Sequence, residues 1–153
     1  MTVHTVLKYI HIVSAIAALG ANITYALWIT RAKKNPGALT FTLRTVKIID
    51  DWIATPAYVL LFPSGWWLTT LAGWSLTTPW IFTSLLLYAM VSIIGLGIFS
   101  PTLKKQIAIA EGQGSDTPEY KKTSARSNTI GIALNILVLI IIYLMVAKPA
   151  LWG

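Results

Sequence analysis

The chain has 153 residues, of which 56% are hydrophobic and only 11% are charged, whereas soluble domains average about 25% charged residues. It carries a net charge of +7 and no cysteine, which excludes disulfides, thiolate metal sites and thiol catalysis. The basic residues cluster between long apolar segments, a pattern typical of a membrane protein and not of a nucleic-acid-binding protein.

Four apolar segments follow one another along the chain, and each is close to the ~20 residues that cross a ~30 Å hydrocarbon core as a helix. None alternates with the period of two that a membrane-spanning strand requires. We therefore predict an all-α integral membrane protein: one domain, residues 1–153, forming an up-down bundle of four transmembrane helices. The predicted helices cover residues 5–30, 40–73, 79–111 and 117–148.

The first predicted helix carries a small, polar face. His11, Ser14, Ala18, Asn22 and Tyr25 follow one another at helical spacing, while the other faces carry Ile, Val and Leu. We expect this face to point into the bundle, because polar groups facing lipid are costly. An ionisable residue at membrane depth indicates a functional site, and a hydrogen bond to a neighbouring helix is the alternative for His11. Asn22 and Tyr25 are candidates for cofactor contacts or for hydrogen bonds between helices.

The second helix is expected to begin as an amphipathic stretch at the membrane surface, LTFTLRTVKIIDDW. Arg44, Lys47, Asp50 and Asp51 form a charged cluster there, in which Arg44 or Lys47 would pair with Asp51. The cluster is either an interfacial anchor with extended basic side chains or a site for a quinone head group or a lipid phosphate.

Two further signals lie in the second half of the chain. After Pro101, LKKQIAIAEGQG predicts a short helix that ends at Gly112 or Gly114. In SDTPEYKK, Asp116 or Thr117 would cap the last helix, with Pro118 in its first turn. This helix would begin in water and enter the membrane near residue 128.

Lys and Arg predict the orientation. By the positive-inside rule, the first and third connections face the cytoplasm and both termini face outward. The basic residues of these two connections are Arg31, Lys33, Lys34, Arg44, Lys47, Lys104, Lys105, Lys121, Lys122 and Arg126.

The residues available for a metal favour haem over zinc. Zinc sites require three or four His, Cys or carboxylate ligands, and the chain has only two histidines, His4 and His11. Haem needs one or two axial ligands and an apolar slot between helices. His4 and His11 lie about 10 Å apart along one helix, so both cannot bind the same iron. A second ligand would be Met145 at a similar depth or the deeper Met90, or the position would stay open.

The chain resembles a bacterial family of predicted integral membrane proteins, catalogued as domain of unknown function 2269. The resemblance rests on KYIH in the first helix, RTVKIIDDWIATP in the second and GWSLTTPW before the third, and it covers nearly the whole chain. It implies a location in the bacterial inner membrane and no established activity.

A more distant resemblance is to the HemJ-type protoporphyrinogen oxidases and the CopD-type copper-resistance membrane proteins. It rests on LKYIH in the first helix and TPAYVLLFPSGWWL in the second. In the HemJ-type enzymes a first-helix histidine is associated with haem b, which implies that role for His11. Their functional third-helix lysine has no equivalent here, which argues against oxidase activity and leaves haem binding open. The Met- and His-rich clusters that favour copper are absent from the sequence.

Three functions are compatible with the sequence. The first is a haem b-binding membrane protein that passes electrons to a quinone or a redox partner, with His11 as axial ligand. The second is a structural or accessory subunit of a larger membrane complex, without cofactor. The third is a small oligomeric transporter or channel, although the lack of intramembrane charges other than His11 gives ions a poor pathway. A homo-oligomer or a larger complex is expected in each case.

Overall fold

The computed structural model describes residues 2–152, and this range is helical with no strand. The helices are α1 (Val3–Ala32), α2 (Pro36–Ile49), the π-helix η1 (Asp50–Ala54), α3 (Thr55–Leu71), α4 (Pro79–Ile94), the π-helix η2 (Gly95–Phe99), α5 (Ser100–Gly112) and α6 (Pro118–Ala147). Because α2, η1 and α3 follow without a break, as do α4, η2 and α5, the described chain forms four long helical segments.

Two prolines explain the two π turns. Pro56 and Pro101 stand at the start of α3 and α5, directly after η1 and η2. A proline inside a helix lacks the N–H group, and its ring clashes with the carbonyl four residues earlier. The Thr55 N–H bonds to the Asp50 carbonyl, and the Ser100 N–H bonds to the Gly95 carbonyl, so each turn spans five residues. The widened turns accommodate the prolines while the helices continue.

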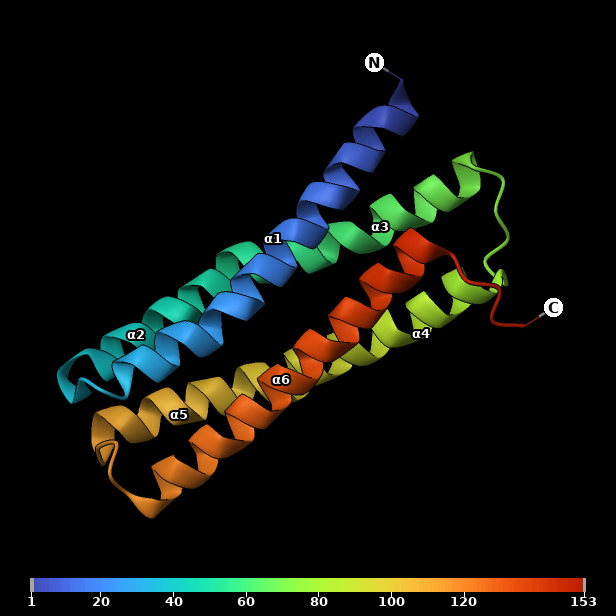
Figure 1. Cartoon of the computed structure of the whole chain (residues 1–153). Coiled ribbons are helices and arrows are strands. Elements are labelled where there is room, and N and C mark those ends of the chain that lie inside the picture. The colour runs from blue at the N-terminus through green and yellow to red at the C-terminus, as the bar shows by residue number, and fades with distance from the viewer. Residues whose placement is uncertain (1, 153) are drawn as a thin grey trace.

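The four segments run back and forth as two hairpins (Figure 1). In one hairpin α1 packs on α3, and in the other α4 packs on α6; the hairpins meet where α2 contacts α5 and α1 contacts α6. Both termini lie at one end of the molecule, and the α1–α2 and α5–α6 connections lie at the other (Figure 1). We call the latter the basic end, after Lys33, Lys34, Lys121 and Lys122, and the former the terminal end.

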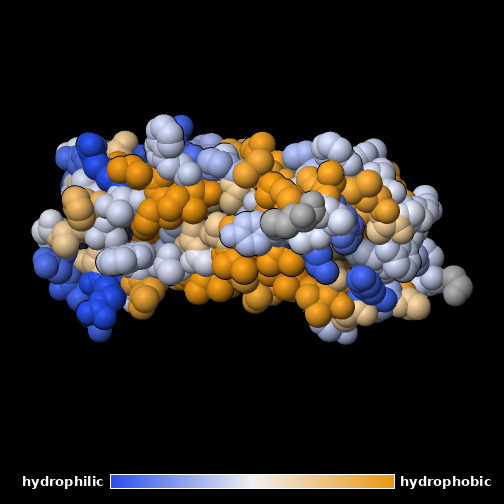
Figure 2. Space-filling view, turned by 90° about the horizontal axis from the view of Figure 1, so that it is seen from above, coloured by the Kyte–Doolittle hydropathy of each residue, from blue (hydrophilic) through white to orange (hydrophobic). Residues whose placement is uncertain are grey.

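A buried apolar contact between α2 and α5 lies toward the basic end. Leu39, Leu43 and Val46 of α2 and Leu103 and Ile109 of α5 are all buried, as the amphipathic pattern of α2 predicts. Many apolar side chains of α1, α3, α4 and α6 are instead exposed, and Figure 2 shows a broad hydrophobic surface in the middle of the molecule, with hydrophilic residues gathered at the basic end. This surface suits contact with lipid.

The predicted inward face of α1 is confirmed: Ser14, Ala18 and Tyr25 are buried. The predicted start of the last helix is also confirmed, since the Thr117 hydroxyl accepts the Tyr120 N–H at 3.3 Å and α6 begins at Pro118. The preceding α5 ends at Gly112, one of the two predicted positions.

Three described helices are long and apolar enough to cross a membrane. They are Val3–Ala32, the continuous segment Pro79–Gly112 and Pro118–Ala147, and their apolar 18-residue stretches have mean hydropathies of 1.7, 2.2 and 2.8. The predicted span in the second segment is not among them. The second segment is long enough, because α2, η1 and α3 are continuous, but two prolines, two tryptophans and several hydroxyl residues lower the hydropathy of α3. The fourth span, and with it the four-span bundle, therefore stays a prediction.

Candidate functional site

His11 lies in the contact between α1 and α3. Its Nδ1 is 3.0 Å from the Ser64 Oγ. The Ser64 hydroxyl donates its own proton to the Leu60 carbonyl at 2.6 Å, one turn back in α3. Since a hydroxyl has one proton to donate, Ser64 must accept from His11, so Nδ1 carries the imidazole proton. The other ring nitrogen, Nε2, then holds a free lone pair.

Gly65 makes room for the imidazole. A Cβ atom added at this position would lie 2.9 Å from His11 Cε1, closer than real Cβ contacts. The ring therefore rests on the α3 backbone, held at one edge by Ser64. Both Ser64 and Gly65 were missed as site residues by the sequence reasoning, because the pairing of α1 with α3 at this level depends on tertiary structure.

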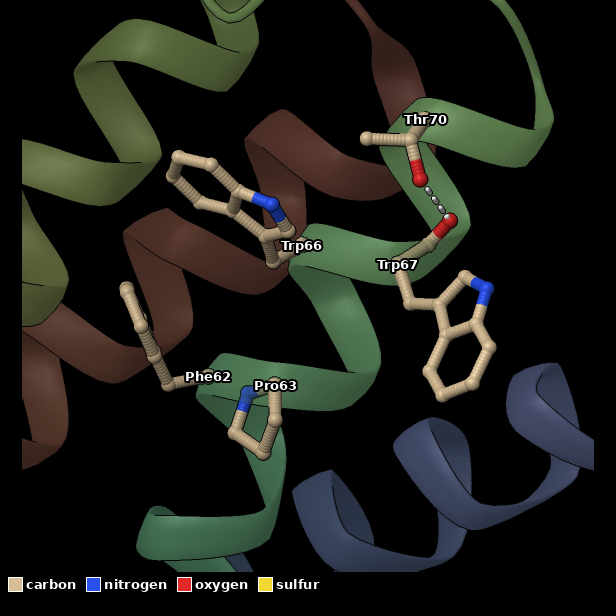
Figure 3. A pocket seen from close by; sticks show the side chains of 5 residues that line it. All are labelled: Phe62, Pro63, Trp66, Trp67 and Thr70. Carbon is tan, nitrogen blue, oxygen red and sulfur yellow. Dashed lines mark hydrogen bonds between the residues drawn. The ribbon is translucent and has the colours of Figure 1, made fainter.

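An aromatic hollow of about 560 Å³ lies on α3 at the same level. Its walls are Phe62, Pro63, Trp66, Trp67 and Thr70. Phe62 and Trp66 project from one side of α3 and Trp67 from the other, with Thr70 hydrogen-bonded to the Trp67 carbonyl at 2.8 Å (Figure 3). This volume is within the range of pockets that hold organic ligands, and the hollow is open on one side.

Asn22 links helices deeper in the molecule. Its Nδ2 donates to the Tyr58 hydroxyl of α3 at 2.7 Å, and the Tyr88 hydroxyl of α4 donates to the Tyr58 carbonyl at 2.7 Å. Phe62 stacks on Tyr88 with ring centroids 6.0 Å apart. This Asn22–Tyr58–Tyr88 chain thus joins α1, α3 and α4, and it supports the interhelical role considered for Asn22.

Tyr25 and Met145 lie apart from His11. Tyr25 is 4% exposed and, with Asn22, lines a second, smaller cavity beside α6. Met145 is half-buried in the last turn of α6. Among residues 2–152, no side-chain hydrogen bond joins Met145 to His11, and neither cavity is lined by both residues. Met145 as a second axial ligand stays a prediction.

The residues of the charged cluster take part in three ion pairs. Lys47 contacts Asp51, as predicted, and also lies 3.8 Å from Asp50. Of the two alternatives for Asp51, the pair with Arg44 is not formed, because the Arg44 Nε instead donates to Glu111 of α5 at 2.5 Å. Burial raises the pKa of Asp50 above its usual range, and Lys47 partly opposes this shift. Lys47 is buried, so it joins α2 to the start of η1 and does not extend into solvent.

Among residues 2–152, no three His, Cys, Asp or Glu side chains are grouped to hold a metal ion. Haem ligation does not require such a group, since one protein ligand can suffice. The chemistry available at His11 is therefore that of a single imidazole bonded to Ser64, and the lining of the aromatic hollow on α3 does not include His11.

Long apolar helices with many exposed apolar side chains, and buried polar residues such as Ser14, Ser64 and Ser84 where helices meet, define a helical integral membrane protein. The chain belongs to the family described as predicted integral membrane protein (DUF2269), whose model matches residues 5–149. No curated protein and no solved structure matches it.

Proposed function

We propose that the protein binds haem b through His11 and serves in electron transfer within the membrane. The observation that carries this proposal is the hydrogen bond from His11 to Ser64, because Ser64 has already donated its own proton to Leu60. Histidines that bind metals characteristically donate one ring N–H to a neighbouring acceptor, which fixes the tautomer and leaves the other nitrogen for the metal.

The surroundings of His11 fit a porphyrin. The aromatic hollow of Phe62, Pro63, Trp66 and Trp67 begins at the chain neighbour of Ser64 and offers an open, apolar surface. When bound, haem would supply a one-electron couple. The chain would orient the ligand through Ser64 and exclude water with the tryptophans. Asn22 and Tyr25 lie about 16 and 21 Å further along α1, so they serve a different level of the bundle.

The distant resemblance to HemJ-type enzymes supports the same position for the ligand, and the missing third-helix lysine separates this chain from their oxidase activity. A quinone or a redox protein is the proposed electron partner. We also propose that the basic end faces the cytoplasm of a bacterial cell, with both termini outside, because Lys33, Lys34, Lys121 and Lys122 gather there.

The visible spectrum of the detergent-purified protein, oxidised and dithionite-reduced, tests the proposal. We expect a Soret band with α and β bands on reduction, all lost in His11→Ala. The matched control is His4→Ala, which removes the other histidine from the same helix and should keep the spectrum. A colourless wild-type protein after expression with ample haem, or a Soret band that survives in His11→Ala, would contradict haem ligation by His11.

A structural role in a larger complex is the second candidate, favoured by the close fit of the His11 ring against Gly65. In that case the imidazole only fastens α1 to α3. The wild-type protein would then be colourless, and His11→Ala would lower its thermal stability and its co-purification with a partner.

A further inference from the structure

Four buried polar atoms without a hydrogen-bond partner surround one cavity. They are the hydroxyl oxygens of Tyr25 and Ser124, Gln106 Oε1 and Asn135 Oδ1, and they are all the buried, unpaired side-chain N and O atoms found in residues 2–152. Every one of these side chains lines the cavity between α1, α5 and α6. Native proteins pair nearly all buried polar groups, so four orphans around one space indicate an occupant.

The size of the cavity restricts that occupant. About 50 Å³ is open to water-sized molecules, and one water requires at least ~10–15 Å³ on this measure. The space therefore holds about three waters and no organic cofactor.

The hydrogen-bonding pattern favours water over a cation as the occupant of the cavity. Gln106 Oε1 and Asn135 Oδ1 only accept, whereas the Tyr25 and Ser124 hydroxyls each have a proton to donate. Water donates twice and accepts twice, so a small cluster satisfies all four groups. A cation would need oxygen atoms alone and would leave the hydroxyl protons unpaired, and no carboxylate lines the cavity to offset its charge.

The cavity extends from the basic end into the apolar part of the molecule. Its lining on α6 runs from Ser124 to Asn135, about 16 Å along the helix. Asn128, in the same lining, is exposed, so the cavity reaches the surface there. On α1 the lining includes Asn22, the first member of the Asn22–Tyr58–Tyr88 chain.

We propose that this cavity is a water-filled inlet that brings water and exchangeable protons from the basic end to the Asn22–Tyr58–Tyr88 chain. The inlet does not depend on haem, since its lining shares no residue with that of the aromatic hollow and does not include His11.

Hydroxyl-radical labelling by water radiolysis, read by mass spectrometry on the full chain in lipid nanodiscs, tests the inlet. Radicals formed from bound water label the side chains that touch it. We expect Tyr25 to be labelled several-fold faster than Tyr120, which is equally buried but bonds to Gln106 and does not line the cavity. Equal, slow labelling of both tyrosines would show a dry cavity and overturn the proposal.

Asn135→Leu replaces a cavity acceptor by an apolar side chain of similar size and should slow labelling of Tyr25. Ile136→Leu, on the exposed side of α6, is the matched control and should leave it unchanged. If Asn135→Leu fails to fold, the wild-type comparison of Tyr25 with Tyr120 still decides. A melting temperature that rises with sodium over choline at equal ionic strength, and only with Asn135 intact, would assign the cavity to a cation and overturn the water assignment.

Discussion

At the scale of single residues, His11 shows how a polar side chain is accommodated within an apolar helix. Ser64 takes one ring nitrogen, and Gly65 removes the side chain that would otherwise occupy the position of the ring. The two neighbours therefore determine both the tautomer and the placement of the imidazole. Substituting Ser64, which accepts the hydrogen bond, or Gly65, which leaves space for the ring, should therefore have a measurable effect by itself.

Gly65→Ala tests the space. The new Cβ would displace the His11 ring from its bond to Ser64, and we expect the free energy of unfolding to fall by about 1–3 kcal/mol, as for overpacking elsewhere. Equilibrium unfolding in mixed micelles measures this. Gly20→Ala is the control: nothing lies within 4 Å of its added Cβ, so it should stabilise α1 by about 0.5–1 kcal/mol. Equal effects of the two substitutions would argue against contact between Gly65 and the ring.

Ser64→Ala tests the hydrogen-bond acceptor of His11, and this test rests on the proposed binding of haem. The substitution leaves His11 in place but removes the partner of Nδ1. Loss of such a partner typically weakens metal binding about 10–100-fold, which haem titration of the apoprotein would measure. The control is Ser14→Ala, which changes a buried serine on the inward face of α1 and should leave haem affinity unchanged. An unaltered affinity in Ser64→Ala would remove the basis for assigning Nε2 as the ligand.

At the scale of elements, short connections and ion pairs hold the helices together at the basic end. Lys105 of α5 lies 2.9 Å from Glu119 in the first turn of α6, and Arg44 of α2 reaches Glu111 of α5. Lys105 lowers the pKa of Glu119 below its usual value of 4.5. Since the pKa is lower in the folded state, the pair stabilises the fold above the unfolded-state pKa, and this contribution is lost as the pH falls through the folded-state pKa.

The pH dependence of unfolding follows from that sign. We expect the melting temperature of the wild-type protein to fall slightly more than that of Glu119→Gln when the pH is lowered from about 6 to 3. The difference should be small and should shrink in high salt, because both side chains are exposed. Asp116→Asn is the control, since its carboxyl is in none of the ion pairs found in residues 2–152. Parallel pH curves for wild type and Glu119→Gln would contradict the prediction.

The helices and their caps could be read from the sequence because apolar length, proline and Thr117 are local signals. The π turns could not, since the helical spacing used to align faces assumes 3.6 residues per turn throughout. The observed partner of Arg44 could not be predicted for a related reason: Asp51, near in sequence, pairs with Lys47, whereas Glu111 becomes near Arg44 only when α2 packs on α5. His11 was found from its unusual location alone, and its partners Ser64 and Gly65 required the fold.

At the scale of the whole molecule, the two ends differ in the contacts that hold their helices together. The basic end has the buried leucines of α2 and α5 together with the ion pairs. At the terminal end, Lys148 lies over the rings of Trp74 and Trp80, 5.8 and 5.5 Å from their centroids. Tryptophan and lysine suit the boundary between lipid and water, so the two ends match the two faces of a bilayer.

The absence of cysteine from the sequence makes the orientation directly testable. Lys34→Cys and Lys122→Cys introduce single thiols at the basic end, and Ser75→Cys introduces one in the α3–α4 connection. If the basic end is cytoplasmic, an impermeant maleimide should label only Ser75→Cys in intact cells and all three variants after permeabilisation. Labelling of Lys34→Cys in intact cells would reverse the proposed orientation.

The two π turns have a consequence for comparing this chain with its relatives. Each holds one residue more than an α-helical turn would, so deleting a single residue within Asp50–Ala54 would restore an ordinary helix. Because the widened turn absorbs that extra residue, the helix beyond the deletion would keep its rotation, and the tyrosine, serine and glycine of α3 would still face α1. Relatives with a one-residue gap at residues 50–54 or 95–99 would therefore share this arrangement of faces, whereas a one-residue gap elsewhere in these helices would rotate the faces beyond it by about 100°.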